Sequence, residues 1–401
     1  MKIKIKNIFR LKNTFGISKN VFVMGWVSFF NDIASEMVYP IVPIFLTTFL
    51  GASVAIVGVI EGIAESTAAL LKVFSGWLSD KFQKRMPFIS SGYSLSAFSK
   101  LLLGLAYSWP IVLIARFLDR FGKGIRTSAR DSLIAESCSA NERGKSFGFH
   151  RALDTLGAVF GPLGAILFLT IFKNNLRLTF YIAFIPALIG IILLLVFVKE
   201  KKKKALCASE LRLRWRDVNP SFKIYLFINI IFFIGNSSDT FLILRAQNLG
   251  LAIKTTIFAY VLFNITYSLL SIPAGIIVDK IGAKKVIITG LFIFSIVYFF
   301  FGFINSSMFI WLLFPIYGIY MALTEGVGKA YISLLVPVEK SGTAFGIYQT
   351  AIGICSFFAS FIAGLMWSYI NVRIPFYFGS IMAFIAAILF IGLGRKVKTI
   401  K

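Results

Sequence analysis

The residues best placed to do chemistry are charged side chains within long apolar stretches of the first half of the chain. Asp32 and Glu36 are four residues apart, which places both carboxylates on one face of a helix. Glu61 and Glu65 have the same spacing. A charge at the centre of a membrane helix costs about 2.5–3.5 kcal/mol, so such groups are expected to face a wet cavity or to pair. Carboxylates in these surroundings can take up and release protons near neutral pH.

Basic side chains follow in the next apolar stretches. The segment 116–136 is unusually charged, and His150 and Asp154 are again four residues apart. Residues assigned to proton coupling or substrate binding are Asp32, Glu36, Glu61, Glu65, Arg116, Arg120, Lys123, Arg151 and Asp154. Two interpretations stay open: a coupling device in which a moving Arg changes the proton affinity of a carboxylate, or a static network of salt bridges.

Membrane helices must position these side chains. The chain has 401 residues, and its mean hydropathy of +0.83 is far above that of a soluble domain. A span of ~20 residues crosses the ~30 Å hydrocarbon core, and it must be helical because backbone polar groups cannot stay unpaired in lipid. We therefore predict an all-α membrane protein. Its twelve transmembrane helices are expected over residues 21–50, 53–80, 87–108, 110–137, 144–172, 177–198, 222–248, 252–279, 285–304, 307–336, 342–370 and 374–394.

The formal net charge of +25 is distributed unevenly between the two sides of the predicted membrane. One side carries most of the Lys and Arg residues, and the other carries only Lys173, Arg177, Lys254 and Arg373. This positive-inside pattern predicts a multi-pass plasma-membrane protein with both termini in the cytoplasm. The basic loops are expected to contact anionic membrane lipid. Nucleic-acid binding is not expected, because no basic soluble domain carries the charge.

Metal, cofactor and enzyme chemistry find no support in the sequence. The three cysteines are scattered, and His150 is the single histidine. Their spacing fits neither a metal site nor a disulfide framework. No nucleophile and base are arranged as in an enzyme, so we expect no metal, no cofactor and no catalysis.

One pattern occurs twice, at an interval of 199 residues. Gly76 lies four residues before Asp80, and Gly275 lies four residues before Asp279. A basic turn follows each copy. A duplication of this length predicts two pseudo-symmetric six-helix bundles. The glycines would allow a neighbouring helix to approach closely, and each Asp would accept hydrogen bonds from the N-terminus of a packed helix.

The predicted domains are an N-terminal bundle over 1–198, a cytoplasmic linker over 199–220 and a C-terminal bundle over 221–401. The repeated pattern and the basic residues near the inner surface are expected to form an inner gate. Its residues are Gly76, Asp80, Arg85, Arg126, Arg130, Gly275, Asp279 and Lys284.

On these motifs the chain resembles the major facilitator superfamily over nearly its whole length, and within it an uncharacterised prokaryotic branch. In that family the pattern follows helix 2 and often recurs after helix 8. A second likeness lies in the fifth predicted helix, where Gly157, Gly161 and Pro162 resemble a Gly-x-x-x-Gly-Pro motif of family exporters. An ordinary kinked packing helix is the alternative, because proline bends helices and glycines let them approach. The resemblance implies two bundles that rock around a central cavity.

The leading hypothesis is a secondary active transporter that works by alternating access and exports a small molecule in exchange for protons, as a monomer. The first alternative is a proton symporter that imports an organic anion held by Arg116, Arg120 and Lys123. A non-transporting membrane receptor is the alternative from a different class.

Overall fold

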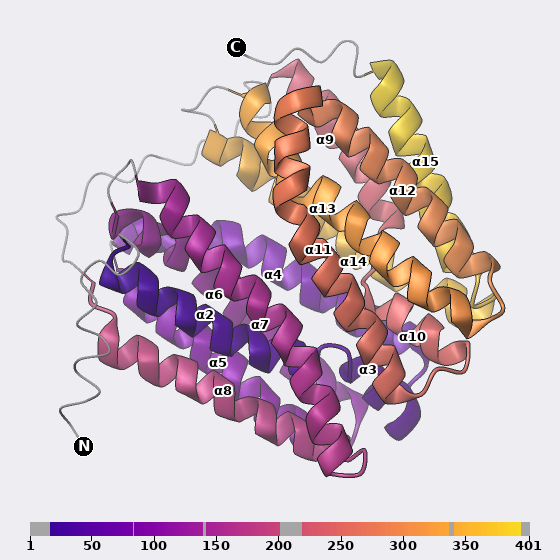
Figure 1. Cartoon of the computed structure of the whole chain (residues 1–401), viewed down its shortest axis with the longest axis horizontal. Helices are drawn as coiled ribbons and strands as arrows, with labels where there is room; N and C mark the ends of the chain where they lie inside the picture. Colours follow the sequence, from indigo (N-terminus) through magenta and orange to yellow (C-terminus); the bar gives the residue numbers. More distant parts are fainter. Residues whose placement is uncertain (1–16, 83, 139–141, 201–218, 337–340, 394–401) are drawn as a thin grey trace. The chain divides into compact units, whose positions relative to one another are not determined.

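The computed structural model describes residues 17–82, 84–138, 142–200, 219–336 and 341–393, and all regular structure within these ranges is helical (Figure 1). In chain order the first elements are α2 (Lys19–Val38), α3 (Val42–Ile44), the π-helical turn η1 (Phe45–Phe49), α4 (Val54–Phe82), α5 (Met86–Gly104), α6 (Trp109–Glu136), α7 (Arg143–Ile171) and α8 (Leu176–Phe197). The later elements are α9 (Pro220–Gly235), α10 (Thr240–Asn248), α11 (Ile253–Ile281), α12 (Ala283–Phe303), the 3₁₀ turn η4 (Ser307–Phe309), α13 (Ile310–Leu335), α14 (Ser341–Tyr369) and α15 (Ile374–Gly392).

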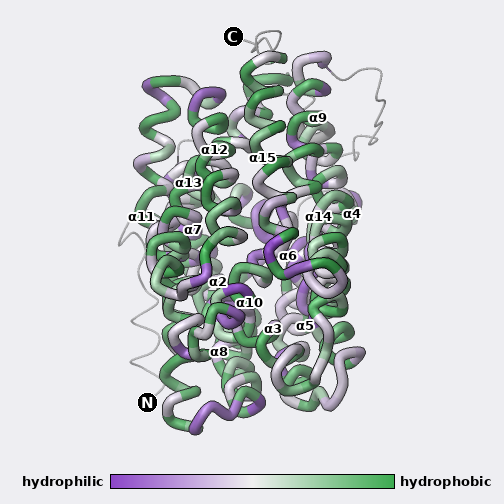
Figure 2. Tube along the Cα trace, turned by 90° about the vertical axis from the view of Figure 1, so that its right-hand side faces the viewer, coloured by the Kyte–Doolittle hydropathy of each residue, from purple (hydrophilic) through white to green (hydrophobic). Residues whose placement is uncertain are grey.

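Ten of the described helical segments are long and apolar enough to cross a membrane, when α2 to η1 and α9 to α10 each count as one span. Together with α5 and α6 they make the twelve helical segments that the sequence predicts. The helices α5 and α6 are less apolar because α5 carries Lys100 and several serines, and charged residues recur along α6. Figure 2 shows hydrophilic segments of this kind interrupting the apolar helices at α6 and α10.

Contacts divide the chain into two compact units. The first unit comprises residues 1–39 and 71–209, and the second comprises residues 40–70 and 210–401. The helix α4 passes from the second unit into the first at Leu71. The predicted linker boundaries stay a prediction, because most of 199–220 lies outside the described residues.

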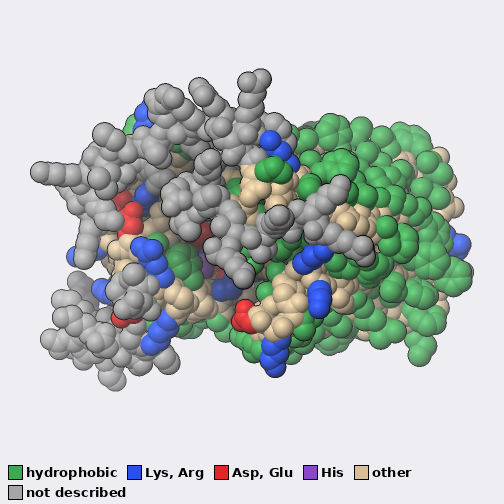
Figure 3. All heavy atoms as spheres, turned by 90° about the horizontal axis from the view of Figure 1, so that it is seen from above, with side chains coloured by type: hydrophobic (Ala, Val, Ile, Leu, Met, Phe, Trp, Pro, Cys, Tyr) green, Lys and Arg blue, Asp and Glu red, His purple; other side chains and the backbone are tan. Residues whose placement is uncertain are grey.

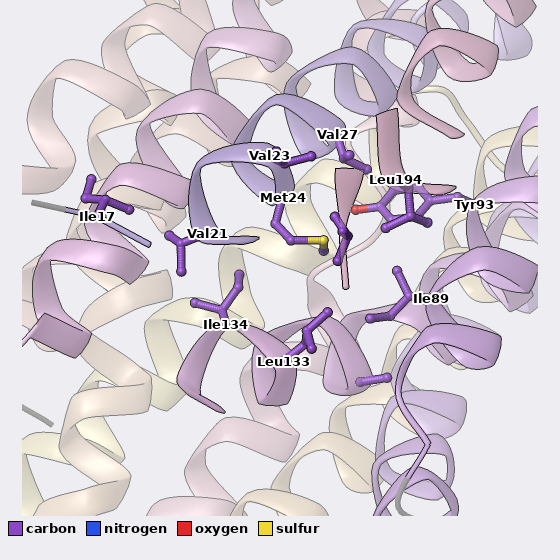
Figure 4. Close-up of a cluster of buried hydrophobic side chains, with 12 residues drawn as sticks. Ile17, Val21, Val23, Met24, Val27, Ile89, Tyr93, Leu133, Ile134 and Leu194 are labelled. Carbon is purple, nitrogen blue, oxygen red and sulfur yellow. The ribbon is translucent and has the colours of Figure 1, made fainter. Parts of the chain in front are cut away.

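In the first unit, α2 packs along α7 and α8, and α5 packs along α6 and α8. Their apolar faces meet in one buried cluster, because side chains three and four residues apart share a helix face. Figure 4 shows Val21, Met24 and Val27 of α2 in this cluster, with Tyr93 of α5 and Leu194 of α8.

In the second unit, α11 packs on α13, α12 packs on α13 and α15, and α9 packs on α14 and α15. Aromatic rings fill the interface of α12 and α13. Phe294 stacks on Tyr298 with ring centroids 3.9 Å apart, and Tyr320 meets Phe294 edge-on at 4.8 Å. The first half of α4 lies on α14, where Gly58 permits contact with the backbone of Ser360.

Two helices are interrupted at corresponding places. After α2 the chain turns at 39–41, where Pro40 cannot supply a backbone donor. After α9 the chain is irregular from 236 to 239, although no proline lies there. Pro40 and Asp239 are 199 residues apart, the interval that also separates Gly76 from Gly275. The interruption therefore belongs to the repeated pattern.

Exposed basic residues follow both copies of the repeated motif. They include Lys81 and Lys84 in the first unit and Lys280 and Lys285 in the second. Figure 3 shows Lys and Arg side chains in blue and hydrophobic side chains in green. Basic residues at the ends of helices with apolar flanks are what membrane helices require.

Candidate functional site

Two glycines of α7 set its distance from α2. A Cβ at Gly157 would lie 2.7 Å from the carbonyl oxygen of Phe29 and 2.9 Å from the Cβ of Asp32. A Cβ at Gly161 would lie 2.7 Å from the Cβ of Glu36. Because no larger residue fits at this separation, the glycine ridge holds α7 directly against the two carboxylate positions of α2.

The carboxyl groups of Asp32 in α2 and Asp154 in α7 are hydrogen-bonded to each other. Ionised carboxylates only accept hydrogen bonds, so a bond between two carboxyl groups requires one proton. The buried hydroxyl Oγ of Ser28 donates to Asp154 Oδ1 at 2.6 Å. The pair is therefore a place where one proton is held between two helices.

Arg130 of α6 connects this acid pair to a third helix. Its Nη1 donates to Ser28 Oγ at 3.3 Å and lies 4.0 Å from Asp154 Oδ1. Its Nη2 lies 3.0 Å from Asp131 Oδ1. On α7, Arg151 Nη1 lies 3.2 Å from Asp154 Oδ2. Arg130 thus lies between two carboxylates, and a shift between them would change the charge that the acid pair experiences.

Two further buried basic side chains belong to the same unit. His150 is the neighbour of Arg151 on α7, and its Nε2 has no hydrogen-bond partner among the described residues. The guanidinium of Arg126 lies 4.6 Å from the ring centre of Tyr93, and its Nη1 likewise has no partner there. Arg126 adds positive charge to this unit, and both groups add hydrogen-bonding capacity.

A second polar cluster joins α5, α6 and α2. Lys100 is only 1% exposed, and its Nζ lies 2.6 Å from Asp119 Oδ1. The ammonium also donates to Ser96 Oγ at 3.1 Å and to Ser35 Oγ at 3.2 Å. Ser96 Oγ in turn donates to Asp119 Oδ1 at 2.5 Å. All three protons of this buried ammonium are used, as a buried charge requires.

Two arginines of α6 extend this cluster along one face. Arg116 Nη1 lies 3.8 Å from Asp119 Oδ2. The guanidinium carbons of Arg116 and Arg120 lie 5.5 Å and 5.6 Å from the ring centre of Tyr39. Cations over a tyrosine ring are stabilised by the negative face of the ring. Asp119 and Tyr39 thus both lie close to buried cations of α6.

The predicted coupling residues are divided between the two units. Asp32 and Glu36 lie in the first unit, whereas Glu61 and Glu65 lie in the second. Glu61 is buried, and Lys123 is exposed. The convergence of these carboxylates stays a prediction. Pro162 lies inside α7, directly after the glycine ridge.

The first copy of the repeated pattern is closely packed. A Cβ at Gly76 would lie 3.2 Å from the Cβ of Ser128 in α6. Arg85 donates to Ser79 Oγ at 2.8 Å and to Glu136 Oε1 at 3.2 Å. The side chain of Asp80 lies outside the described part of the structure.

The second copy is open. Nothing described lies within 4 Å of a Cβ built at Gly275, so the close approach expected there stays a prediction. Asp279 is exposed and Lys284 is half-buried. No other described helix packs on Gly275. The inner-gate role of this copy stays a prediction.

In the second unit, carboxylates are bonded to tyrosines. Tyr317 Oη donates to Asp239 Oδ1 at 2.6 Å, and Tyr267 Oη donates to Glu325. Lys329 Nζ lies 3.7 Å from Glu325 Oε1, one helical turn away on α13.

Sequence reasoning did not select the Lys100–Asp119 pair or Ser28 as site residues. Lys100, a lone lysine within an apolar helix, could have indicated this pair, because such a charge needs a buried partner. No feature of the sequence identified Ser28 as a site residue, since a serine in a membrane helix commonly bonds the backbone of its own helix. In the described residues no three His, Cys, Asp or Glu side chains are arranged to hold a metal ion.

Comparisons with known proteins agree with the geometry. The chain matches the model of the Major Facilitator Superfamily over residues 24–244 and 224–400. The uncharacterized MFS-type transporter MJ1317 of Methanocaldococcus jannaschii is 40% identical over 381 residues, which cover 93% of this chain and 94% of that relative. The chain belongs to the Major Facilitator Superfamily. It is therefore a membrane transporter and not an enzyme.

Two more distant likenesses complete the comparison. The Quinolone resistance protein NorA of Staphylococcus aureus is 22% identical over 188 residues, 47% of each chain. The crystal structure of a POT family transporter in complex with 5-aminolevulinic acid shares the fold, with a TM-score of 0.82 at 14% identity over 96% of this chain and 98% of that one.

Proposed function

We propose that this transporter couples substrate movement to protons and that the Asp32–Asp154 pair is the coupling site. One observation carries the proposal: two carboxyl groups from different helices share a hydrogen bond that requires a proton. Arg130 lies 4.0 Å from Asp154 and can exchange that partner for Asp131. Approach of the guanidinium favours release of the proton, and withdrawal favours its uptake.

A conformational change of α2 or α7 would alter the geometry of the Asp32–Asp154 pair. The contact between α2 and α7 depends on Gly157 and Gly161, so a small slide of either helix changes the distance between the carboxyl groups. Alternating access would supply that slide through rocking of two six-helix bundles, residues 1–198 and 221–401. In this proposal the protein is a plasma-membrane monomer with cytoplasmic termini, and the repeated motif forms its inner gate.

Export is the proposed direction of transport. The Gly157 and Gly161 ridge resembles the motif of family exporters, and here it contacts the helix that carries Asp32. The partial likeness to a quinolone resistance protein points the same way. A small molecule would leave the cell while protons enter it.

Infrared difference spectroscopy of the purified protein across a pH titration tests the proposal without a known substrate. We expect a protonated-carboxyl band that is lost in both Asp32→Asn and Asp154→Asn. Glu36→Gln, one turn away on the same face of α2, is the matched control and should keep the band. In proteoliposomes, the two Asn variants should lose proton flux driven by a substrate found in a thermal-shift screen. A band and a flux unchanged in both variants would refute proton coupling at this pair.

Uptake of an organic anion by proton symport is the second candidate, and the gathering of cations around Asp119 favours it. Arg116 and Arg120 lie over one tyrosine ring, and Lys100 binds Asp119 beside them. Guanidinium groups bind carboxylate and phosphate groups strongly, so an anionic substrate suits this cluster. Right-side-out and everted vesicles with an imposed pH gradient separate the two directions, because only one orientation accumulates the substrate.

A further inference from the structure

The buried face of α7 differs on the two sides of the acid pair. Between the start of the helix at Arg143 and Asp154, its buried residues are Ser146, His150 and Leu153. Beyond Asp154 the buried residues have no polar side-chain atom: Gly157, Gly161, Pro162, Ala165 and Leu169. On this face, polar side chains therefore extend from the acid pair toward the Arg143 end of the helix and not toward the other end.

Ser146, His150 and Asp154 form a polar row along this face. Each is four residues from the next, so neighbouring side chains lie one helical turn apart on the same side of α7. Ser146 is 1% exposed and His150 is 4% exposed. At the helical rise of 1.5 Å per residue, the row covers most of the roughly 16 Å between Asp154 and Arg143.

The Arg143 end of α7 lies at a basic end of the first unit. Arg143 and Lys145 are exposed there. The helix α6 ends at Glu136, shortly before α7 begins, and Asn20 at the start of α2 donates to Ser137 Oγ at 3.2 Å. The ends of three helices therefore meet on this side. In the proposed topology this side faces the cytoplasm, because basic helix ends lie inside.

Two atoms of the polar row have unused hydrogen-bonding capacity. His150 Nε2 and Ser146 Oγ are buried and have no hydrogen-bond partner among the described residues. Buried polar atoms of this kind commonly bond ordered water. Side chains one turn apart have Cβ atoms about 5–6 Å from each other, so a bridging water is needed for a proton to pass between them. A hydroxyl and a neutral imidazole each provide the donor and the acceptor that such transfer requires.

Charges of both signs act on the His150 ring. They come from α6, α7 and α2, and they are Arg130, Asp131, Arg151, Asp154 and, through its bond to Asp154, Asp32. The carboxylates stabilise a protonated imidazole, and the guanidinium groups promote loss of its proton. Histidine changes charge close to neutral pH, so a ring in these surroundings can take up a proton and release it again.

We propose that His150 relays protons between the Asp32–Asp154 pair and the Arg143 end of α7, with Ser146 as the next step. This inference rests on the proposed proton coupling at that pair and adds the route to the aqueous phase. The O–H bond of the carboxyl group breaks and leaves a carboxylate, while Nε2 gains the proton and the ring becomes an imidazolium. The imidazolium then gives a proton to water beside Ser146 and returns to its neutral form.

Exchange of the carboxyl proton for deuterium tests the relay in the purified full-length protein without a substrate. The infrared band of a protonated carboxyl group shifts when deuterium replaces the proton, and the rate of this shift is measured after rapid transfer into D₂O. We expect His150→Ala and His150→Gln each to slow the exchange about a hundredfold while the band itself is kept, because a positioned acid–base group contributes at least this much. Ser146→Ala should slow it about fivefold, the effect of one hydrogen bond.

Matched variants separate proton transfer from packing. Ser146→Thr keeps the hydroxyl and should keep the rate. Thr155→Val should also keep it, because the Thr155 hydroxyl donates to the Arg151 carbonyl of the same helix at 2.8 Å and lies outside the row. His150→Gln keeps hydrogen bonding but cannot carry a proton, so a normal rate in this variant overturns the relay even if His150→Ala is slow or fails to fold.

Failure of the relay and failure of the acid pair give different results. If the relay is wrong and the pair is right, the carboxyl band is present, Asp32→Asn and Asp154→Asn abolish it, and His150→Gln exchanges at the normal rate. If the unaltered protein shows no such band, the pair holds no proton, and the relay is overturned together with it.

Discussion

Asp119 in the first unit and Asp239 in the second accept hydrogen bonds from different kinds of partner. In the first unit, Asp119 accepts from the ammonium of Lys100 at 2.6 Å. In the second unit, Asp239 accepts from the hydroxyl of Tyr317, also at 2.6 Å. A cation satisfies the carboxylate and cancels its charge, whereas a tyrosine satisfies one oxygen and leaves the charge in place. Two hydrogen bonds of equal length therefore have different electrostatic consequences.

This difference separates two kinds of site. Where carboxylates share cations, as Asp131 and Asp154 share Arg130, a small movement exchanges partners and changes proton affinity. Where a tyrosine hydroxyl donates to the carboxylate, as at Asp239, that hydrogen bond does not cancel the negative charge. Variants that remove one partner at a time test whether this contrast is real.

Lys100→Met should have the largest effect. It leaves Asp119, which is 7% exposed, with Arg116 at 3.8 Å and Arg120 as the nearby cations. Breaking a buried pair by removing one partner costs about 3–5 kcal/mol, and we expect the low end because Arg116 remains. Unfolding in a denaturing detergent measures the change. Lys100→Met with Asp119→Asn should recover part of the loss, and an equal loss in both variants would contradict a charge effect.

Tyr317→Phe in the second unit should cost about 1.5–3 kcal/mol, because a hydrogen bond to a charged group is lost while the ring packing stays. The same unfolding assay applies. If the contrast holds, adding Asp239→Asn to Tyr317→Phe restores stability, since the carboxylate charge is then absent. Tyr331→Phe is a suitable control, because Tyr331 is buried in the same helix and makes ring contacts with Tyr225. A loss as large in that control would show that the phenol hydroxyl at 317 has no special role.

Much of the fold could be predicted from the sequence, because the hydrophobic runs determine where membrane helices lie. The ends of the twelve predicted helices agree with the described segments to within a few residues. The break at 236–239 could not be predicted from proline, since none lies there, and only a run of polar residues marked it. No described atom lies within 4 Å of a Cβ at Gly275, so the close approach expected there stays a prediction, since glycine permits contact without requiring a neighbour.

The candidate site was predictable in part. The i,i+4 spacing correctly placed Asp32 and Glu36 on one helix face, where Gly157 and Gly161 contact them. The bond between Asp32 and Asp154 joins residues over 120 positions apart, so it depends on helix packing that spacing does not reveal. The meeting of Glu61 and Glu65 with that pair stays a prediction.

Gly157→Ala compared with Gly275→Ala tests the two kinds of glycine. Alanine at 157 meets the carbonyl of Phe29 and the Cβ of Asp32, and overpacking of this kind costs about 1–3 kcal/mol. Alanine at 275 meets no described atom, and replacing glycine within a helix stabilises by about 0.5–1 kcal/mol. Opposite shifts of the unfolding temperature are expected. A neutral Gly157→Ala would mean that α2 and α7 do not rely on this contact.

The smallest effect is expected for Lys329→Gln. The Lys329 and Glu325 side chains are 48% and 37% exposed, and exposed i,i+4 pairs contribute about 0.3–0.5 kcal/mol. Tyr267→Phe removes a different partner of Glu325 and should cost more, because that hydroxyl bonds the carboxylate directly. Measuring both variants at low and high salt sharpens the contrast, since only the lysine contribution should fall with salt. If Lys329→Gln cost more than Tyr267→Phe, a cation would hold this carboxylate after all, and the second unit would resemble the first.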